Sequence, residues 1–105
     1  MLSVILEFDV VEGKSEEFIL CWTECTRVIY DNFGSLGSRL HRDKDGKFIA
    51  YAQWPDLDTY EKESIWPDDL VVYRDKMRAL LKSGKPKVLH LLDVEVDLLK
   101  SQQYN

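Results

Sequence analysis

An arginine and a histidine two residues apart, Arg39 and His41, are the polar side chains of this sequence best suited to chemistry on a small molecule. They lie in a segment expected to be a β-strand, where residues two apart share a face. Histidine can act as a base near neutral pH, and arginine can hold an anion. We therefore predict that His41 is catalytic and that Arg39 binds ligand, with His90 as a further polar candidate. The alternative is that Arg39 and His41 face solvent near a hairpin turn, and that His90 is a hydrogen-bonded histidine of the sheet.

Five aromatic residues could form the walls of a pocket for a planar molecule, namely Trp22, Trp54, Trp66, Tyr51 and Tyr73. Aromatic rings supply large apolar surfaces against which another ring can stack. We predict Trp54, Trp66, Tyr73 and Tyr51 as ligand-binding residues. The alternative is structural: Trp22 lies on an apolar helix stripe, and Trp54 could simply fill one end of the core.

Charge argues against binding to nucleic acid, because the 105 residues carry a net charge of −5 and phosphate contacts need clustered basic residues. One local exception follows Leu70. A basic segment there could favour an anionic group nearby, or it could be a solvated helix face with mixed charges. Its basic residues are Arg74, Lys76, Arg78, Lys82, Lys85 and Lys87.

The two cysteines, Cys21 and Cys25, lie four residues apart in an expected helix, where a disulfide is geometrically awkward, so we expect buried thiols. This spacing, with only His41 and His90 elsewhere, is not that of a zinc site, and we expect no metal. The N-terminal run lacks the features of a signal peptide, and no stretch is long and apolar enough to span a membrane. We therefore expect a cytoplasmic protein with no membrane partner.

Hydrophobic periodicity and turn signals divide the chain into four strands and three helices. We expect strands at 2–11, 35–42, 47–54 and 87–99, a helix at 15–32, a short helix after Asp56, and a longer helix from Asp68 to Ser83 and Gly84. With right-handed crossovers, this order builds an α+β fold of the ferredoxin-like, split βαβ type, which is a four-stranded antiparallel sheet with its helices on one face.

The last expected strand is apolar on both faces in its first half, with Val88, Leu89, Leu91 and Leu92 close together. Helices can cover only one face of the sheet, and a chain this short has no second layer of its own. We therefore predict a homodimer in which the open faces of two sheets meet.

The stretch from Phe33 to Glu61, FGSLGSRLHRDKDGKFIAYAQWPDLDTYE, resembles the antibiotic biosynthesis monooxygenase family. The shared pattern is a glycine that opens the second strand, Arg-Leu-His near its end, an aromatic-rich third strand that ends in Trp and an acidic residue, and then a short helix. The resemblance implies a dimeric α+β barrel, with a single domain of this kind at 1–100 and a polar tail at 101–105.

The resemblance also implies a function, which is cofactor-independent monooxygenation of a planar aromatic or quinol-type small molecule, with no metal or flavin. Trp54 matches the family's tryptophan that lies by the substrate. The position of the family's strand-three asparagine falls on Ala50, and that of a glutamate found in many relatives falls on Ala52. The alternative is a non-catalytic dimeric module that binds a small molecule and has lost the oxygenase residues.

Overall fold

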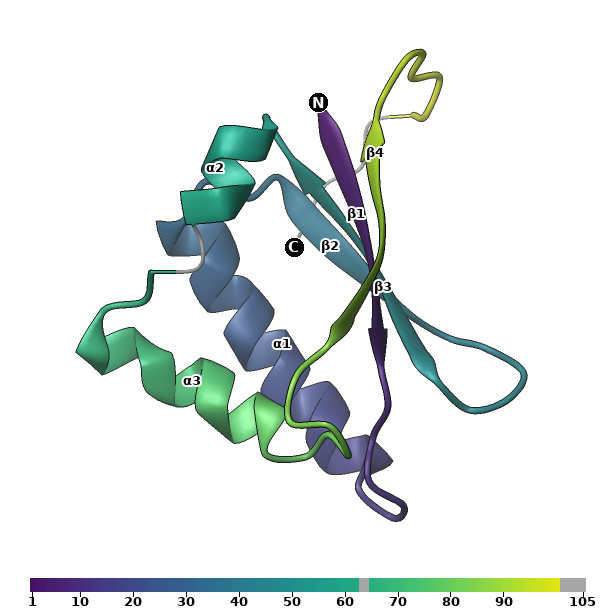
Figure 1. The fold of residues 1–105 in the computed structure, drawn as a ribbon, viewed down its shortest axis with the longest axis vertical. Helices are drawn as coiled ribbons and strands as arrows, with labels where there is room; N and C mark the ends of the chain where they lie inside the picture. The colour runs from purple at the N-terminus through teal and green to yellow at the C-terminus, as the bar shows by residue number, and fades with distance from the viewer. Residues whose placement is uncertain (63–64, 101–105) are drawn as a thin grey trace.

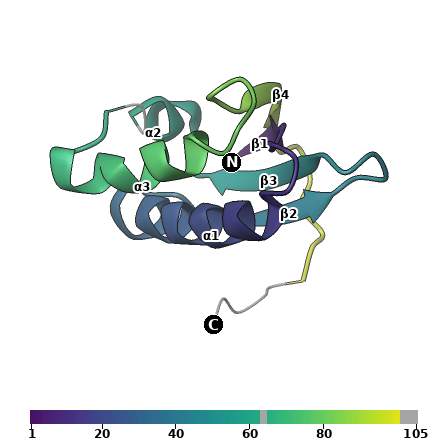
Figure 2. The ribbon, with the colours of Figure 1, turned by 90° about the horizontal axis from the view of Figure 1, so that it is seen from below.

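The computed structural model describes residues 1–62 and 65–100, and the predicted polar tail at 101–105 lies outside the described residues. Its sheet has the strand order β2-β3-β1-β4, and all neighbouring strands are antiparallel. The helices lie on one side of this sheet (Figure 1), and α1 and α3 lie side by side (Figure 2). The predicted ferredoxin-like fold, an open four-stranded antiparallel sheet with helices on one face, is confirmed. Its elements are β1 (Leu2–Phe8), α1 (Ser15–Asn32), β2 (Gly37–Arg42), β3 (Phe48–Trp54), α2 (Leu57–Lys62), α3 (Asp68–Arg78) and β4 (Lys87–Asp93).

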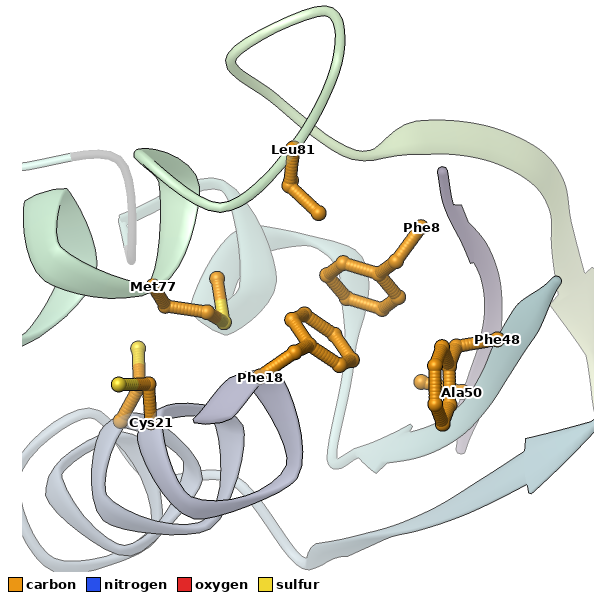
Figure 3. Packing of buried hydrophobic residues seen from close by; sticks show 8 residues of the cluster. Phe8, Phe18, Cys21, Phe48, Ala50, Met77 and Leu81 are labelled. Carbon is orange, nitrogen blue, oxygen red and sulfur yellow. The ribbon is translucent and has the colours of Figure 1, made fainter. Parts of the chain in front are cut away.

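Helix α1 supplies the main stripe of side chains that packs on the sheet. Phe18, Cys21 and Cys25 recur at helical spacing and are buried. The Phe18 ring lies 5.3 Å from that of Phe8 in β1 and 4.9 Å from that of Phe48 in β3. Figure 3 shows these rings together in the layer between helices and sheet. This contact fixes the long helix across the two central strands.

Gly34 directly follows Phe33, the C-cap residue of α1. Its φ of +79° lies in the left-handed region, which side chains with a Cβ rarely adopt. A Cβ atom built on Gly34 would lie 3.0 Å from Cγ2 of Thr59 in α2. The residue therefore serves two purposes, since it turns the chain into β2 and lets α2 approach closely.

The side chains of β3 alternate between the buried helix side of the sheet and its open face. Phe48, Ala50, Ala52 and Trp54 are buried beneath the helices, and the residues between them lie on the other face. Antiparallel pairing places Leu6 of β1 opposite Ala50. The helix side of the two central strands is thus apolar, with two small residues at its centre.

Strand β4 is shorter than predicted, and it ends at Asp93 and not near Leu99. The reason lies in its partner: Asp93 pairs with Leu2, the first residue of β1, so the sheet offers little more strand beyond this point. After one further bond, from the Val94 N–H to the carbonyl of Met1, the chain leaves the sheet. The described helices include none that is long and apolar enough to cross a membrane.

Candidate functional site

A cavity of about 200 Å³ lies between the helices and the helix side of the sheet. Ala50 and Ala52 of β3 form its floor, together with Leu6 and Phe8 of β1. Because both alanines are buried and carry only a methyl group, the sheet leaves room there that a larger side chain would occupy. The cavity therefore results from small residues in the middle of an otherwise bulky strand.

Aromatic side chains form much of the cavity wall, and they come from β3, α1, α2 and the segment before α3. Trp54 is only 3% exposed, and its ring meets that of Tyr60 edge-on at 5.5 Å. Trp66 packs against Phe33 at a ring distance of 4.8 Å. With Trp22, which also lines the space, these rings make a site suited to a planar apolar molecule.

Among the described residues, the charged groups in the cavity lining are Arg74, Arg78 and Lys85, and these are all basic. Arg74 and Arg78 are one helical turn apart in α3, so both project from the same side of the helix. The Arg74 guanidinium lies over the Trp66 ring, 5.6 Å from its centroid. Among the described residues, no Asp, Glu or His lines this cavity, so the charge of its described lining is positive.

Three nitrogen donors of the cavity-lining residues are buried and have no hydrogen-bond partner in the described part of the chain: Nε1 of Trp66, Nε of Arg74 and Nε of Arg78. The nearest ion-pair contact of Arg74 is Oδ1 of Asp75, 3.6 Å from its Nε. A buried donor left without an acceptor costs about 1–3 kcal/mol. A ligand that brings an acceptor oxygen would offset this cost.

Helix α2, which carries Tyr60, begins at a side-chain cap. The Thr59 N–H donates to Oδ1 of Asp56 over 2.7 Å. Hydrogen bonds from the Thr59 side chain and backbone lower the pKa of the Asp56 carboxyl group. The cap helps to hold the Tyr60 side of the cavity in place.

The predicted site residues do not all meet in this cavity. Trp54 and Trp66 line it. Tyr73 is 37% exposed on α3 and is not part of the lining. Arg39 pairs with Tyr51, and His41 pairs with Ile49, on the opposite face of the sheet.

On that open face, Arg39, His41 and Tyr51 line a groove of about 730 Å³. Ser3 Oγ and Gln53 Nε2 donate to the Tyr51 hydroxyl oxygen over 3.3 and 2.8 Å. Nδ1 of the exposed His41 lies 3.2 Å from the carbonyl oxygen of Ile49. The sheet separates these groups from the aromatic cavity, so a catalytic role for His41 stays a prediction for the open face.

Site prediction from the sequence missed several lining residues, among them Tyr60, Arg74, Arg78 and Lys85. A signal for the last three was present in the basic segment after Leu70, which could favour an anionic group nearby or be a solvated helix face with mixed charges. The four-residue spacing of Arg74 and Arg78 also places them on one side of a helix. Within the described residues, no cluster of three or more His, Cys, Asp or Glu side chains could hold a metal ion.

Comparison with known proteins gives matches among solved structures. The chain superposes on the cofactor-independent oxygenase SnoaB of Streptomyces nogalater with a TM-score of 0.75 and 19% identity, over 94% of this chain and 97% of SnoaB. For a Bordetella bronchiseptica protein assigned to the antibiotic biosynthesis monooxygenases, the TM-score is 0.76 at 16% identity, over 90% and 97% of the two chains. Rv0793 of Mycobacterium tuberculosis gives 0.72 at 14% identity, over 93% and 98%.

Neither the family models nor the curated proteins compared with this sequence give a match. At identities below 25%, the structural matches show a shared fold. The resemblance to the antibiotic biosynthesis monooxygenase family is thus confirmed at the level of the fold.

Proposed function

We propose that this protein binds a small planar aromatic molecule between its helices and sheet and oxidises it with molecular oxygen, without a cofactor. The observation that carries this proposal is the aromatic cavity, whose walls include Trp22, Trp54 and Trp66 and whose charged groups, in the part of the chain that the structure describes, are all basic. The fold shared with a cofactor-independent oxygenase supports it.

The basic lining suits the chemistry that such a reaction requires. Oxygen accepts electrons readily only from an electron-rich substrate, such as the anion of a phenol or quinol. Arg74, Arg78 and Lys85 would stabilise this anion and make the substrate more acidic inside the cavity than in water. Because no Asp, Glu or His of the described residues lines the cavity, the substrate proton would pass to water.

For a one- or two-ring phenol whose keto form carries a CH₂ group in the ring, the two hydrogens of that carbon leave with one oxygen atom as water. The second oxygen atom becomes the carbonyl oxygen on that carbon. The substrate thereby loses four electrons, which reduce both atoms of O₂. The protein's part is to bind the ring, favour its anion and exclude bulk solvent from the reacting carbon.

Oxygen consumption with a panel of one- and two-ring quinols and phenols, with an anthrone-type phenol as a larger member, tests the proposal. We expect uptake above the rate in buffer, and we expect it to persist in Tyr73→Ala, whose side chain lies outside the cavity. It should also persist in His41→Ala, because the sheet separates His41 from the cavity. No uptake with any member of the panel would contradict the enzyme proposal.

If His41→Ala loses activity while its melting temperature is unchanged, the chemistry takes place on the open face. That result would contradict a reaction in the aromatic cavity. It would support the role of His41 as a base that the sequence predicts.

A second candidate function is supported by Ala50 and Ala52, which lie on the cavity floor and carry no polar group. A module with this cavity could bind an aromatic molecule and leave it unchanged. Binding of the panel compounds by calorimetry, with no oxygen uptake, would favour this function.

We also propose that two copies associate through the open sheet face. Leu92 pairs with Ser3 on that face and is 46% exposed, although it belongs to a four-stranded sheet. The described helices lie on the other side (Figure 1), so a second copy would cover this apolar surface. Light scattering should give twice the mass of the chain, and Leu92→Asp should shift it to one chain. Val72→Asp, a matched change on exposed α3, should leave the mass unchanged.

A further inference from the structure

We infer that the ligand of the aromatic cavity is an aromatic acid with one or two rings, whose carboxylate binds Arg74 and Arg78. This inference rests on the cavity being a ligand site, as proposed above, and it adds the charge and the size of the ligand. It does not depend on whether the ligand is then oxidised.

The charge follows from the groups that line the cavity. Three basic side chains and, among the described residues, no acidic ones face a space whose other walls are largely apolar. Arg74 and Arg78 are partly buried and one helical turn apart, so their like charges repel one another, and an anion between them would relieve the repulsion. Asp75 contacts Arg74 at 3.6 Å, but its side chain is 64% exposed, so this ion pair is weakened by solvent.

The carboxylate follows from the donors. Arg74 and Arg78 each have a buried Nε with no hydrogen-bond partner among the described residues, and they are one turn apart on α3. The guanidinium fork matches the two oxygens of a carboxylate. The buried Nε1 of Trp66, beneath the Arg74 guanidinium, offers a third donor.

The size follows from the cavity volume of about 200 Å³. An apolar cavity of about 150 Å³ is large enough for benzene. The space therefore suits one or two rings with a small substituent, with the ring near Trp54 and Tyr60 and the acid toward α3.

The test compares two compounds of nearly equal shape, 2-naphthoate and the neutral 2-naphthamide, by titration calorimetry without oxygen turnover. We expect the acid to bind at least about tenfold more tightly, the size of effect usual for a charged hydrogen bond. Its affinity should also fall with added salt. Equal or tighter binding of the amide would overturn the inference.

Two variants extend the test. Arg78→Gln should remove most of the preference for the acid and leave the affinity for the amide unchanged. Arg27→Gln removes the same charge from an exposed position on α1, away from the cavity, and should keep the preference. If Arg78→Gln weakens both compounds equally, the arginine shapes the cavity and does not recognise the acid, and the inference is wrong.

The outcomes separate this inference from the proposed function. Preference for the acid without oxygen uptake with any substrate would leave the inference standing and remove the enzyme proposal. Oxygen uptake with neutral quinols, together with no preference for the acid, would support the enzyme proposal and overturn the inference.

Discussion

Replacing Ala52 with leucine should fill part of the aromatic cavity, and the sign of its effect on stability tests whether this space exists. Leucine adds three carbon atoms to a side chain that is 8% exposed and lies on the cavity floor. At about 0.8 kcal/mol for each buried carbon, the gain in the free energy of unfolding is at most about 2.4 kcal/mol. If the neighbourhood were fully packed, the same change would instead cost about 1–3 kcal/mol.

Urea denaturation of Ala52→Leu gives this free energy directly, provided that the slope of the transition is unchanged. We expect a higher midpoint, and a melting temperature raised by about 4–8 °C for each kcal/mol gained. The variant should also lose affinity for naphthoate, because its side chain occupies the same space. Ala79→Leu is the matched control, since Ala79 is exposed at the end of α3 and the change there should alter stability by less than about 0.5 kcal/mol. A clearly less stable Ala52→Leu protein would refute the reasoning.

Two further predictions concern the approach of α2 to the rest of the fold. Gly34→Ala should destabilise the protein more than Gly13→Ala in urea denaturation. Both glycines have positive φ, but of the two only Gly34 has another residue, Thr59, in the way of an added Cβ. Equal losses in the free energy of unfolding would show that backbone strain alone matters. Asp56→Ala should lower the melting temperature at about pH 5–7 through loss of the helix cap. Because Thr59 lowers the pKa of Asp56, the carboxylate stabilises the fold fully above its ordinary pKa of 3.8 and progressively less as the pH falls below it. The difference in melting temperature from the wild type should therefore shrink in acid, and a constant difference down to about pH 2 would contradict this account.

Local signals were sufficient to predict much of the fold. The helix at Ser15–Asn32 and the hairpin that follows it were predicted because their apolar periods, glycines and turn residues all agree. The end of β4 could not be found in this way. The residues after Asp93 continue an apolar and polar alternation, but β1 begins at Leu2 and leaves little strand to pair with them. The length of a strand depends on its neighbour, which the local sequence does not contain.

The predicted site residues lie on two faces of the sheet, and the reason is simple. Tyr51 and Trp54 are three residues apart in one strand, so they must lie on opposite faces of the sheet, whatever the register of the hairpin. The burial of Trp54 beneath the helices therefore excludes Tyr51 from the same pocket, and Arg39, which pairs with Tyr51, is excluded with it.

The two faces of β3 correspond to the two roles that we propose for this protein. Trp54, Ala52 and Ala50 alternate with Gln53, Tyr51 and Ile49 along one strand. The first set leaves an aromatic space beneath α3, whose arginines give it a positive charge. The second set holds a hydrogen-bonded tyrosine on a surface that the described helices leave uncovered. Substitutions at the even-numbered positions of β3 should accordingly alter ligand binding, and those at the odd-numbered positions should alter the association of two copies. Ala52→Leu and Tyr51→Ala are neighbouring changes that test the two effects separately.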